Sequence, residues 1–277
     1  MILGTSSPLQ HNSPKEWASK HAALGLKAIN FPVDYTAGEK VYMEYKEAAE
    51  KYGLIIAEVG VWKNTLAKDF AERQKWINYA IEQLKMADKI EAICCVNVAG
   101  TPHGPRWDGG YKENFSKETF NQTVAMVQQI IDTAQPKFTK YSIESMPWMI
   151  PTGPDEYLEL INAVNRPQFA AHLDIVNMIT SPQRFFFNED FLDECFSKLS
   201  GKIVSCHLKD VLLKPEYTFQ LEECACGKGS LNLRHFIELA TKQNKKMPMI
   251  IEHLTTDQEY LKSIDYIKNL AKDLIEK

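Results

Sequence analysis

The sequence predicts an α/β protein in which eight parallel strands form a single closed (β/α)8 barrel. Two observations support this fold class. Short apolar runs alternate with longer amphipathic segments along all 277 residues, as in chains that build βαβ units. There are eight such runs, and a chain of roughly 250 residues is typical of one barrel of eight strands. We therefore expect one domain that covers residues 1–277.

The expected strands are mostly apolar on both faces, as parallel strands covered by helices should be. Each is short and bounded by turn residues. In chain order they are Met1–Gly4, Lys27–Val33, Leu54–Trp62, Glu91–Gly100, Lys140–Met146, Phe169–Ile175, Ile203–Asp210 and Pro248–Leu254.

The expected helices lie between these strands. Ser13 is a candidate N-cap, with Pro14 in the first helical position and Gly25 closing the helix. Further helices are expected at Lys68–Met86, from Ser116 to about Ala134, and at Asp155–Val164, Glu189–Leu199, Asn232–Gln243 and Asp257–Ile275. In the second of these seven helices an apolar stripe is formed by Phe70, Trp76, Ile77, Ala80, Ile81 and Leu84.

A doubly wound open sheet is the main alternative to the barrel. A nucleotide-binding sheet of that kind usually carries a glycine-rich turn after its first strand. Here Met1–Gly4 is followed by Thr-Ser-Ser-Pro, so the barrel is favoured.

Composition excludes several classes of function. The formal net charge is −4, whereas nucleic-acid binders usually carry a basic excess. Residues 1–10 lack the basic start and apolar run of a signal peptide. No segment approaches the roughly 18 apolar residues that span a bilayer. The six cysteines form no disulfide-like framework. We expect a cytoplasmic protein that binds neither nucleic acid nor membrane.

Ligand-type side chains stand near the carboxyl ends of the last four expected strands, where barrel active sites lie. These residues are Glu144, Asp174, His207 and Glu252. They are 30, 33 and 45 residues apart, about one βα unit per step. Three carboxylates and one imidazole suit a divalent cation such as Mn²⁺, Mg²⁺, Co²⁺ or Zn²⁺. Burying the carboxylates together without a cation would be costly.

Taken singly, each of these residues has an ordinary structural explanation. A carboxylate at a strand end often caps a helix, and a lone strand histidine is often a core residue. Four on successive strands favour one metal ion at the carboxyl-terminal face of the barrel. Cys224 and Cys226 could suggest a soft-metal site, but two thiols at this spacing are better read as plain loop cysteines.

Taken together, these residues resemble the xylose isomerase-like TIM barrels, also called sugar phosphate isomerases/epimerases. This family includes ketose 3-epimerase and endonuclease IV-like branches. The resemblance covers essentially the whole chain. It is carried by Ile143-Glu144, Leu173-Asp174, the segment 207–210 (HLKD), the turn 227–229 (GKG), the segment 250–252 (IIE), and loop residues 100–109 and 114–118.

The resemblance implies that Glu144, Asp174, His207 and Glu252 bind the metal. It also implies that Glu144 and Glu252 move protons on opposite sides of a small carbohydrate substrate. One carboxylate would remove a proton beside the carbonyl, giving a cis-enediolate held by the cation. Reprotonation at the same carbon from the other face gives epimerisation, and reprotonation at the next carbon gives isomerisation.

Further residues are candidates for binding the substrate, each with a structural alternative. His172 and Lys209 share strand faces with Asp174 and His207; the alternatives are a packed core histidine and an ion pair with Asp210 or Glu252. Asn97, His103 and Arg106 could contact substrate or tether loops. The tryptophans after three strands could form the wall of a sugar site or simply pack. The full set is His172, Lys209, Asn177, Asn97, His103, Arg106, Trp107 and Trp62, with Trp148 as a third wall residue.

The sequence also departs from the epimerase pattern. Asn177 stands where those enzymes usually have a histidine, and only Lys209 and Lys214 follow the metal histidine where they have an arginine. An inosose-type dehydratase therefore remains an alternative. An endonuclease IV-like phosphodiesterase is a less favoured alternative, because this sequence lacks the additional histidine ligands that such an enzyme needs. A non-catalytic sugar-binding barrel is a further alternative. Residues 227–230 (GKGS) could bind phosphate or form a plain turn, and a homo-oligomer is possible.

Overall fold

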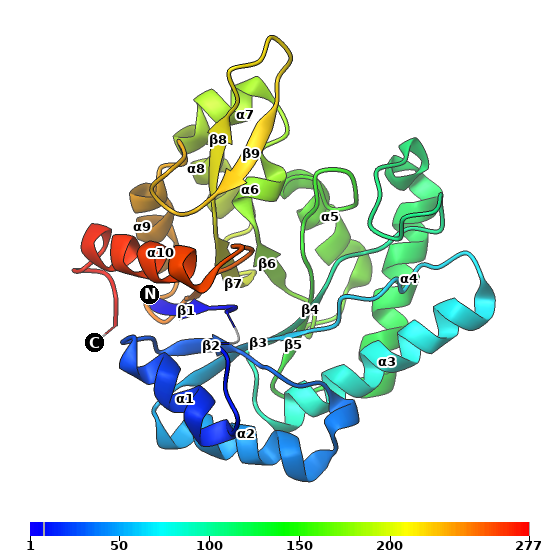
Figure 1. Cartoon of the computed structure of the whole chain (residues 1–277). Coiled ribbons are helices and arrows are strands. Elements are labelled where there is room, and N and C mark those ends of the chain that lie inside the picture. The colour runs from blue at the N-terminus through cyan, green and yellow to red at the C-terminus, as the bar shows by residue number, and fades with distance from the viewer. Residues whose placement is uncertain (8, 277) are drawn as a thin grey trace.

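The computed structural model describes residues 1–7 and 9–276 and shows eight parallel strands around a common axis (Figure 1). The strands are paired in the order β5-β4-β3-β2-β1-β10-β7-β6. Their bounds are β1 Ile2–Thr5, β2 Ala28–Asn30, β3 Ile55–Gly60, β4 Cys94–Asn97, β5 Lys140–Ile143, β6 Ala171–Leu173, β7 Ile203–Leu208 and β10 Pro248–Ile251. All eight expected strands are confirmed, and the fold is a (β/α)8 barrel.

The barrel closes between β5 and β6, the two ends of the paired series. Single parallel bridges join Tyr141 to Phe169 and Glu144 to His172 at this seam. Tyr157, from the helix between the two strands, reinforces it. Its hydroxyl donates to the Ile143 carbonyl and accepts a hydrogen bond from the His172 N–H at 2.9 Å. One phenol therefore joins the strands that carry Glu144 and Asp174.

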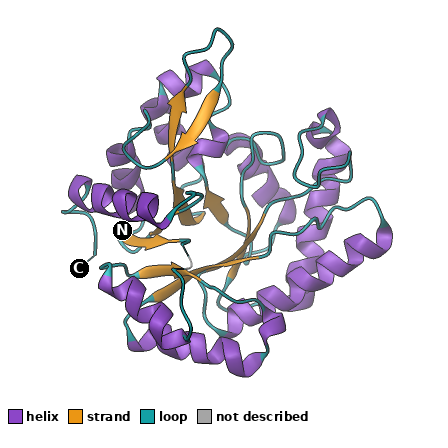
Figure 2. Cartoon of the chain, in the orientation of Figure 1, coloured by secondary structure: helices purple, strands orange, loops and turns teal. Residues whose placement is uncertain are grey.

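Helices surround the strands on the outside (Figure 2). Their bounds are α1 Pro14–Ala23, α2 Glu39–Lys51, α3 Phe70–Lys89, α4 Lys117–Ala134, α5 Pro154–Val164, α6 Ile175–Met178, α7 Pro182–Phe186, α8 Asn188–Lys198, α9 Leu233–Gln243 and α10 Asp257–Leu270; the 3-10 turns are η1 Tyr35–Ala37 and η2 Lys112–Phe115. The seven expected helices are confirmed, and Ser13 and Ser116 cap α1 and α4 with their side chains.

Two features of the helical layer differ from the sequence prediction. Helix α2 was not among the helices expected from the sequence, because seven of its 13 residues are charged and only Tyr42 and Ala49 are buried. The apolar stripe of α3 is not buried along its whole length, because Phe70 is 69% exposed. Phe70 begins the helix, where its ring contacts the Arg73 guanidinium instead.

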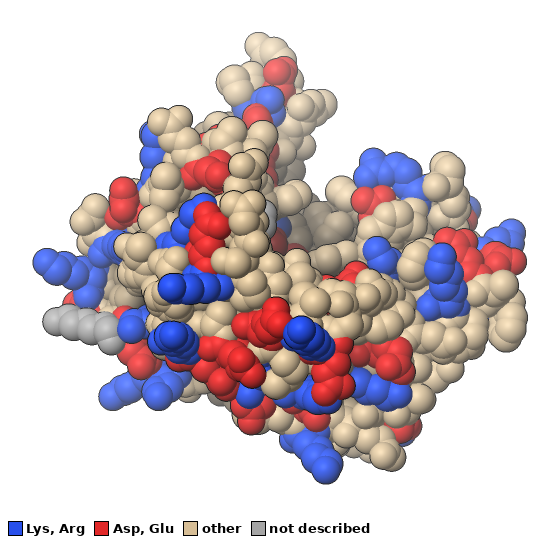
Figure 3. Space-filling model, turned by 60° about the horizontal axis from the view of Figure 1, so that its bottom comes forward, with Lys and Arg blue, Asp and Glu red and all other residues tan. Residues whose placement is uncertain are grey.

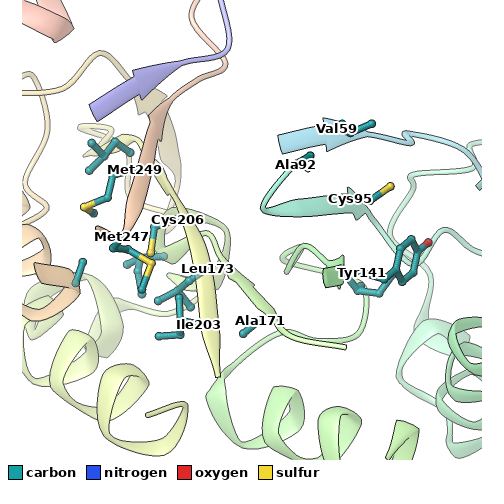
Figure 4. Close-up of a cluster of buried hydrophobic side chains, with 14 of the residues drawn as sticks. Val59, Ala92, Cys95, Tyr141, Ala171, Leu173, Ile203, Cys206, Met247 and Met249 are labelled. Carbon is teal, nitrogen blue, oxygen red and sulfur yellow. The ribbon is translucent and has the colours of Figure 1, made fainter. Parts of the chain in front are cut away.

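The main hydrophobic core fills the space between the strands and the surrounding helices. Figure 4 shows part of it, with Leu173, Cys206 and Met249 projecting from neighbouring strands. The cluster includes residues from Met1 to Ala271. Inside the barrel, by contrast, polar side chains gather at the carboxyl ends of the strands. A second, small apolar cluster of Ile2, Ala28, Ala57 and Ile250 is also buried, so the polar residues are confined to the carboxyl-terminal end of the barrel.

A β-hairpin that the sequence did not predict extends from the barrel after β7 (Figure 1). It consists of β8 Asp210–Leu213 and β9 Leu221–Cys224, paired antiparallel. At its base, Asp210 accepts hydrogen bonds from the backbone N–H groups of Gly227 and Gly229, both at 2.9 Å. In the turn of residues 227–230, which the sequence suggested as a possible phosphate site, these backbone N–H groups therefore donate to Asp210 instead.

The surface carries both signs of charge, interspersed over the face shown in Figure 3. Among the described residues, no helix is long and apolar enough to cross a bilayer.

Candidate metal and catalytic site

The four predicted metal ligands meet at the carboxyl end of the barrel. Glu144, Asp174 and Glu252 directly follow β5, β6 and β10, and His207 is the penultimate residue of β7. Each offers a ligand atom, and these atoms all lie within 4.8 Å of one another. Because parallel strands end on the same side of a barrel, side chains far apart in sequence converge here.

The imidazole of His207 organises this cluster. Its Nδ1 lies 2.8 Å from a Glu252 carboxylate oxygen, 3.2 Å from a Glu144 oxygen and 3.6 Å from an Asp174 oxygen. The ring is completely buried, with its side chain 0% exposed. One nitrogen of the ring therefore faces all three carboxylates.

The opposite nitrogen of His207 faces a residue that the sequence analysis did not include in the site. Glu58, in the middle of β3, places Oε2 3.2 Å from His207 Nε2. Its other oxygen accepts a hydrogen bond from the Ser205 hydroxyl at 2.6 Å. A signal was present in the sequence, because Glu58 is an acidic residue inside the apolar strand Ile55–Gly60.

Lys209 supplies a buried positive charge beside the cluster. Its ammonium nitrogen lies 2.7 Å from Asp174 Oδ2, 2.7 Å from Glu252 Oε1 and 3.6 Å from Glu223 Oε2 in β9. The predicted alternative of an ion pair with Glu252 is thus seen, whereas Asp210 binds the turn instead. Lys209 also lines the cavity at the barrel mouth.

The two glutamates have different electrostatic environments. Burial raises the pKa of Glu144 to about 8. Burial also acts on Glu252, but the charges of His207 and Lys209 outweigh it and lower the pKa of Glu252 to about 2. Although burial disfavours the imidazolium, Glu252, Glu58 and Glu144 hold the pKa of His207 well above its usual value. Neighbouring carboxylates with opposite shifts are suited to exchanging protons with a common substrate.

The donor set fits a divalent cation. Asp174 directs Oδ2 into the cluster, where this fully buried atom lies 2.7 Å from the Lys209 ammonium and 3.6 Å from His207 Nδ1. Its other oxygen, Oδ1, caps α6 by accepting the Asn177 N–H at 3.1 Å. Hard carboxylate oxygens with one imidazole nitrogen are ligands for Mn²⁺, Mg²⁺, Co²⁺ or Zn²⁺. A cation here would compete with Lys209 for Asp174 and Glu252.

A cavity of about 330 Å³ opens beside these residues. This volume is at the small end of the range for ligand sites in proteins. Its walls combine carboxylates with apolar and aromatic side chains. It is lined by Trp62, Val98, Trp107, Asp108, Glu144, Met146, Asn177, Lys209, Glu252 and His253. The predicted wall residues Trp62 and Trp107 therefore lie at the site, and each is partly exposed.

Asn177 also lies at the site, where its amide contacts a catalytic candidate. Its Nδ2 group lies 3.2 Å from Glu144 Oε1 and donates to the Ser145 carbonyl at 3.0 Å. The residue that replaces the epimerase histidine therefore holds the Glu144 carboxylate.

Other substrate-binding candidates lie elsewhere. Asn97 is buried, and its amide exchanges hydrogen bonds with the backbone of Lys63 at 3.1 and 3.0 Å, which is the predicted loop-tethering alternative. Arg106 is 72% exposed in its side chain and pairs with Asp108 at 3.2 Å. His103 and Arg106 are outside the lining of the cavity as the described residues form it.

His172 is completely buried beneath His207, with their ring centroids 4.1 Å apart. Its Nδ1 lies 3.4 Å from Glu58 Oε1. Burial lowers the pKa of His172 to about 4, so the ring is neutral near pH 7. This position corresponds to the packed barrel histidine of the sequence analysis.

Comparison with known families agrees with this architecture. Residues 19–270 match the family described as the xylose isomerase-like TIM barrel. The chain belongs to this family. No curated protein sequence is significantly similar to the chain.

Solved structures of similar fold cover nearly the whole chain. A D-psicose 3-epimerase of Clostridium cellulolyticum H10, solved with D-tagatose, has a TM-score of 0.73 at 11% identity over 100% of both chains. A xylose isomerase-like barrel protein of Mycobacterium smegmatis in complex with magnesium has a TM-score of 0.70 at 15% identity, covering 99% of this chain and 97% of its own. A 3-keto-D-glucoside 4-epimerase of E. coli has a TM-score of 0.70 at 14% identity, covering 97% and 99%. At these identities the likeness establishes the fold.

Proposed function

We propose that this protein is a metal-dependent enzyme that epimerises or isomerises a small sugar or a related polyhydroxy carbonyl compound. The observation that carries the proposal is the convergence of Glu144, Asp174, Glu252 and His207 Nδ1 beside a cavity. Membership of the xylose isomerase-like family supports it. The names of neighbouring folds, which include a psicose 3-epimerase and a keto-glucoside epimerase, support the substrate class.

Four residues would hold the cation: Glu144, Asp174, His207 and Glu252. When bound there, a divalent cation would polarise a substrate carbonyl and make the adjacent C–H more acidic. Both glutamates line the cavity. One carboxylate removes the proton beside the carbonyl, and the other returns a proton to the same or the neighbouring carbon.

The remaining cavity residues bind and orient the substrate in this proposal. The indole faces of Trp62 and Trp107 offer apolar surface for the C–H groups of a sugar. Asn177 holds the Glu144 carboxylate. Lys209 can donate a hydrogen bond to a substrate oxygen once a cation has taken over its carboxylate partners.

The test combines metal content with hydrogen exchange. The protein is purified without chelator, its divalent metal is quantified, and it is incubated with ketoses and aldoses in D2O. We expect about one equivalent of metal, and deuterium at a carbon beside the carbonyl. Glu144→Gln and Glu252→Gln should each abolish the exchange, because an amide cannot accept the proton. Lys214→Met is the matched control, since Lys214 pairs with Glu222 on the hairpin.

The position of the deuterium distinguishes epimerisation from isomerisation. Loss of water from the substrate would instead indicate the dehydratase alternative. Failure to bind Mn²⁺, Mg²⁺, Co²⁺ or Zn²⁺ would refute the proposal.

A further inference from the structure

Glu58 is a fully buried carboxylate that the proposed reaction leaves without a role. It lies in β3 and reaches across the barrel interior to β7, from which β2, β1 and β10 separate it in the strand order. Only 1% of its surface is exposed. Burying a carboxylate costs free energy unless it is paired, so Glu58 needs partners that stabilise its charge.

Both oxygens of Glu58 are engaged by β7. Oε1 accepts the Ser205 hydroxyl at 2.6 Å, and Oε2 lies 3.2 Å from His207 Nε2. Ser205 and His207 are two positions apart on one strand, so their side chains point to the same face. His172 adds a third contact at 3.4 Å from Oε1. The carboxylate is therefore fixed in place with one oxygen aimed at the imidazole.

A histidine that binds a metal must present an unprotonated nitrogen to it, and the other nitrogen then carries the proton. In His207 the nitrogen that faces Asp174, Glu144 and Glu252 is Nδ1. An acceptor on the opposite side of the ring favours the tautomer with hydrogen on Nε2. Such an acceptor also makes the unprotonated Nδ1 a stronger electron-pair donor to a metal ion.

We propose that Glu58 is the positioning residue of the metal centre: it accepts the Nε2–H of His207 and thereby makes Nδ1 the metal-binding nitrogen. This inference rests on the metal site of the proposed function but does not depend on which reaction occurs there. It goes beyond the four ligands by assigning a function to a residue on a strand that contributes none of them.

A second metal ion is the competing explanation, because Glu58, Cys94 and His172 also lie close enough to share one. The contacts favour the positioning role. The Cys94 thiol donates toward the Ala57 carbonyl at 3.5 Å. Burial raises the pKa of this thiol well above its usual value, which opposes the thiolate that a metal requires. Both Glu58 oxygens already have partners.

The test measures metal affinity and the tautomer of His207, neither of which requires turnover. Mn²⁺ affinity is determined by chelator competition for the full-length protein and for Glu58→Leu and Glu58→Gln. Leucine removes the acceptor, so we expect binding about 10–100-fold weaker. Glutamine keeps an acceptor oxygen and should restore part of the loss. Asp88→Asn is the control, because Asp88 is a carboxylate that binds the backbone N–H groups of residues 137–139 and is outside the cluster.

Nitrogen-15 NMR of the Zn²⁺-loaded protein, with His207 assigned by comparison with His207→Gln, reports which nitrogen is bound. We expect coordinated Nδ1 and protonated Nε2. Coordination through Nε2, or Glu58→Leu binding Mn²⁺ within about threefold of the parent protein, would overturn the inference. Two metal equivalents that fall to one in Glu58→Leu would assign Glu58 to a second site instead. A protein that binds no metal refutes both proposals, whereas metal binding without turnover refutes only the proposed function.

Discussion

Replacing Lys209 with methionine tests how the carboxylate cluster is stabilised without a metal. Only 5% of the Lys209 surface is exposed, and its ammonium lies 2.7 Å from both Asp174 and Glu252. Methionine keeps much of the side-chain volume but removes the charge. Removing one partner of a buried ion pair typically costs about 3–5 kcal/mol, because the other charge stays buried and unpaired. We expect the metal-free variant to lose stability on this scale.

The magnitude can be expressed as a change in Tm. An unfolding entropy of about 2.1 cal/mol/K per residue gives roughly 0.6 kcal/mol per degree for a chain of this length. The expected loss then corresponds to a decrease of about 5–9 °C in metal-free protein. With saturating Mn²⁺ the decrease should be less than half as large, because the cation supplies the positive charge that Lys209 provided.

Differential scanning calorimetry with EDTA and with Mn²⁺ makes the comparison. Lys214→Met is the control, since Lys214 forms a partly exposed ion pair with Glu222 at 2.9 Å and such pairs contribute about 0–1 kcal/mol. An equal decrease in Tm with and without Mn²⁺ would contradict the reasoning, as would no decrease in the metal-free protein.

Two further predictions concern proton uptake and barrel closure. The affinity for Mn²⁺ should increase from pH 6.5 to pH 8.5, because Glu144, with its pKa raised by burial to about 8, and His207, with its pKa also raised, hold protons that the metal must displace. The increase should reach up to about tenfold per pH unit for each proton displaced, and a flat profile in chelator titrations would contradict it. Tyr157→Phe should destabilise the protein by about 2–4 kcal/mol in urea denaturation, because the buried Ile143 carbonyl and His172 N–H each lose a partner. A loss below about 0.5 kcal/mol would show that the phenol does not support the seam.

The strands and the four polar residues that meet at the barrel mouth could be predicted because both depend on local sequence patterns. An apolar run bounded by turn residues marks a buried parallel strand whatever it pairs with. A polar residue at the end of such a run must lie at one end of the barrel, since all parallel strands end on the same side. Glu144, Asp174, His207 and Glu252 were found in this way. The helix caps at Ser13 and Ser116 are local in the same sense.

Contacts between distant segments could not be predicted in this way. Asn97 ends a strand but holds the backbone of Lys63. The hairpin Asp210–Cys224 follows His207, and its pairing brings Glu223 toward Lys209. In each case the sequence offered several chemically equivalent partners for the side chain, and the path of the backbone decided which of them lies close enough to contact it.

The sequence by itself determined the barrel, the order of its strands along the chain and the residue types that meet at its mouth, because periodicity and strand ends are properties of neighbouring residues. Only the tertiary structure decided which atoms of those residues face one another. Glu58 and Ser205 are 147 residues apart and come into contact across the barrel interior. The direction in which His207 presents its two nitrogens depends on that contact. Strand spacing and barrel closure set such distances, and no local pattern encodes them.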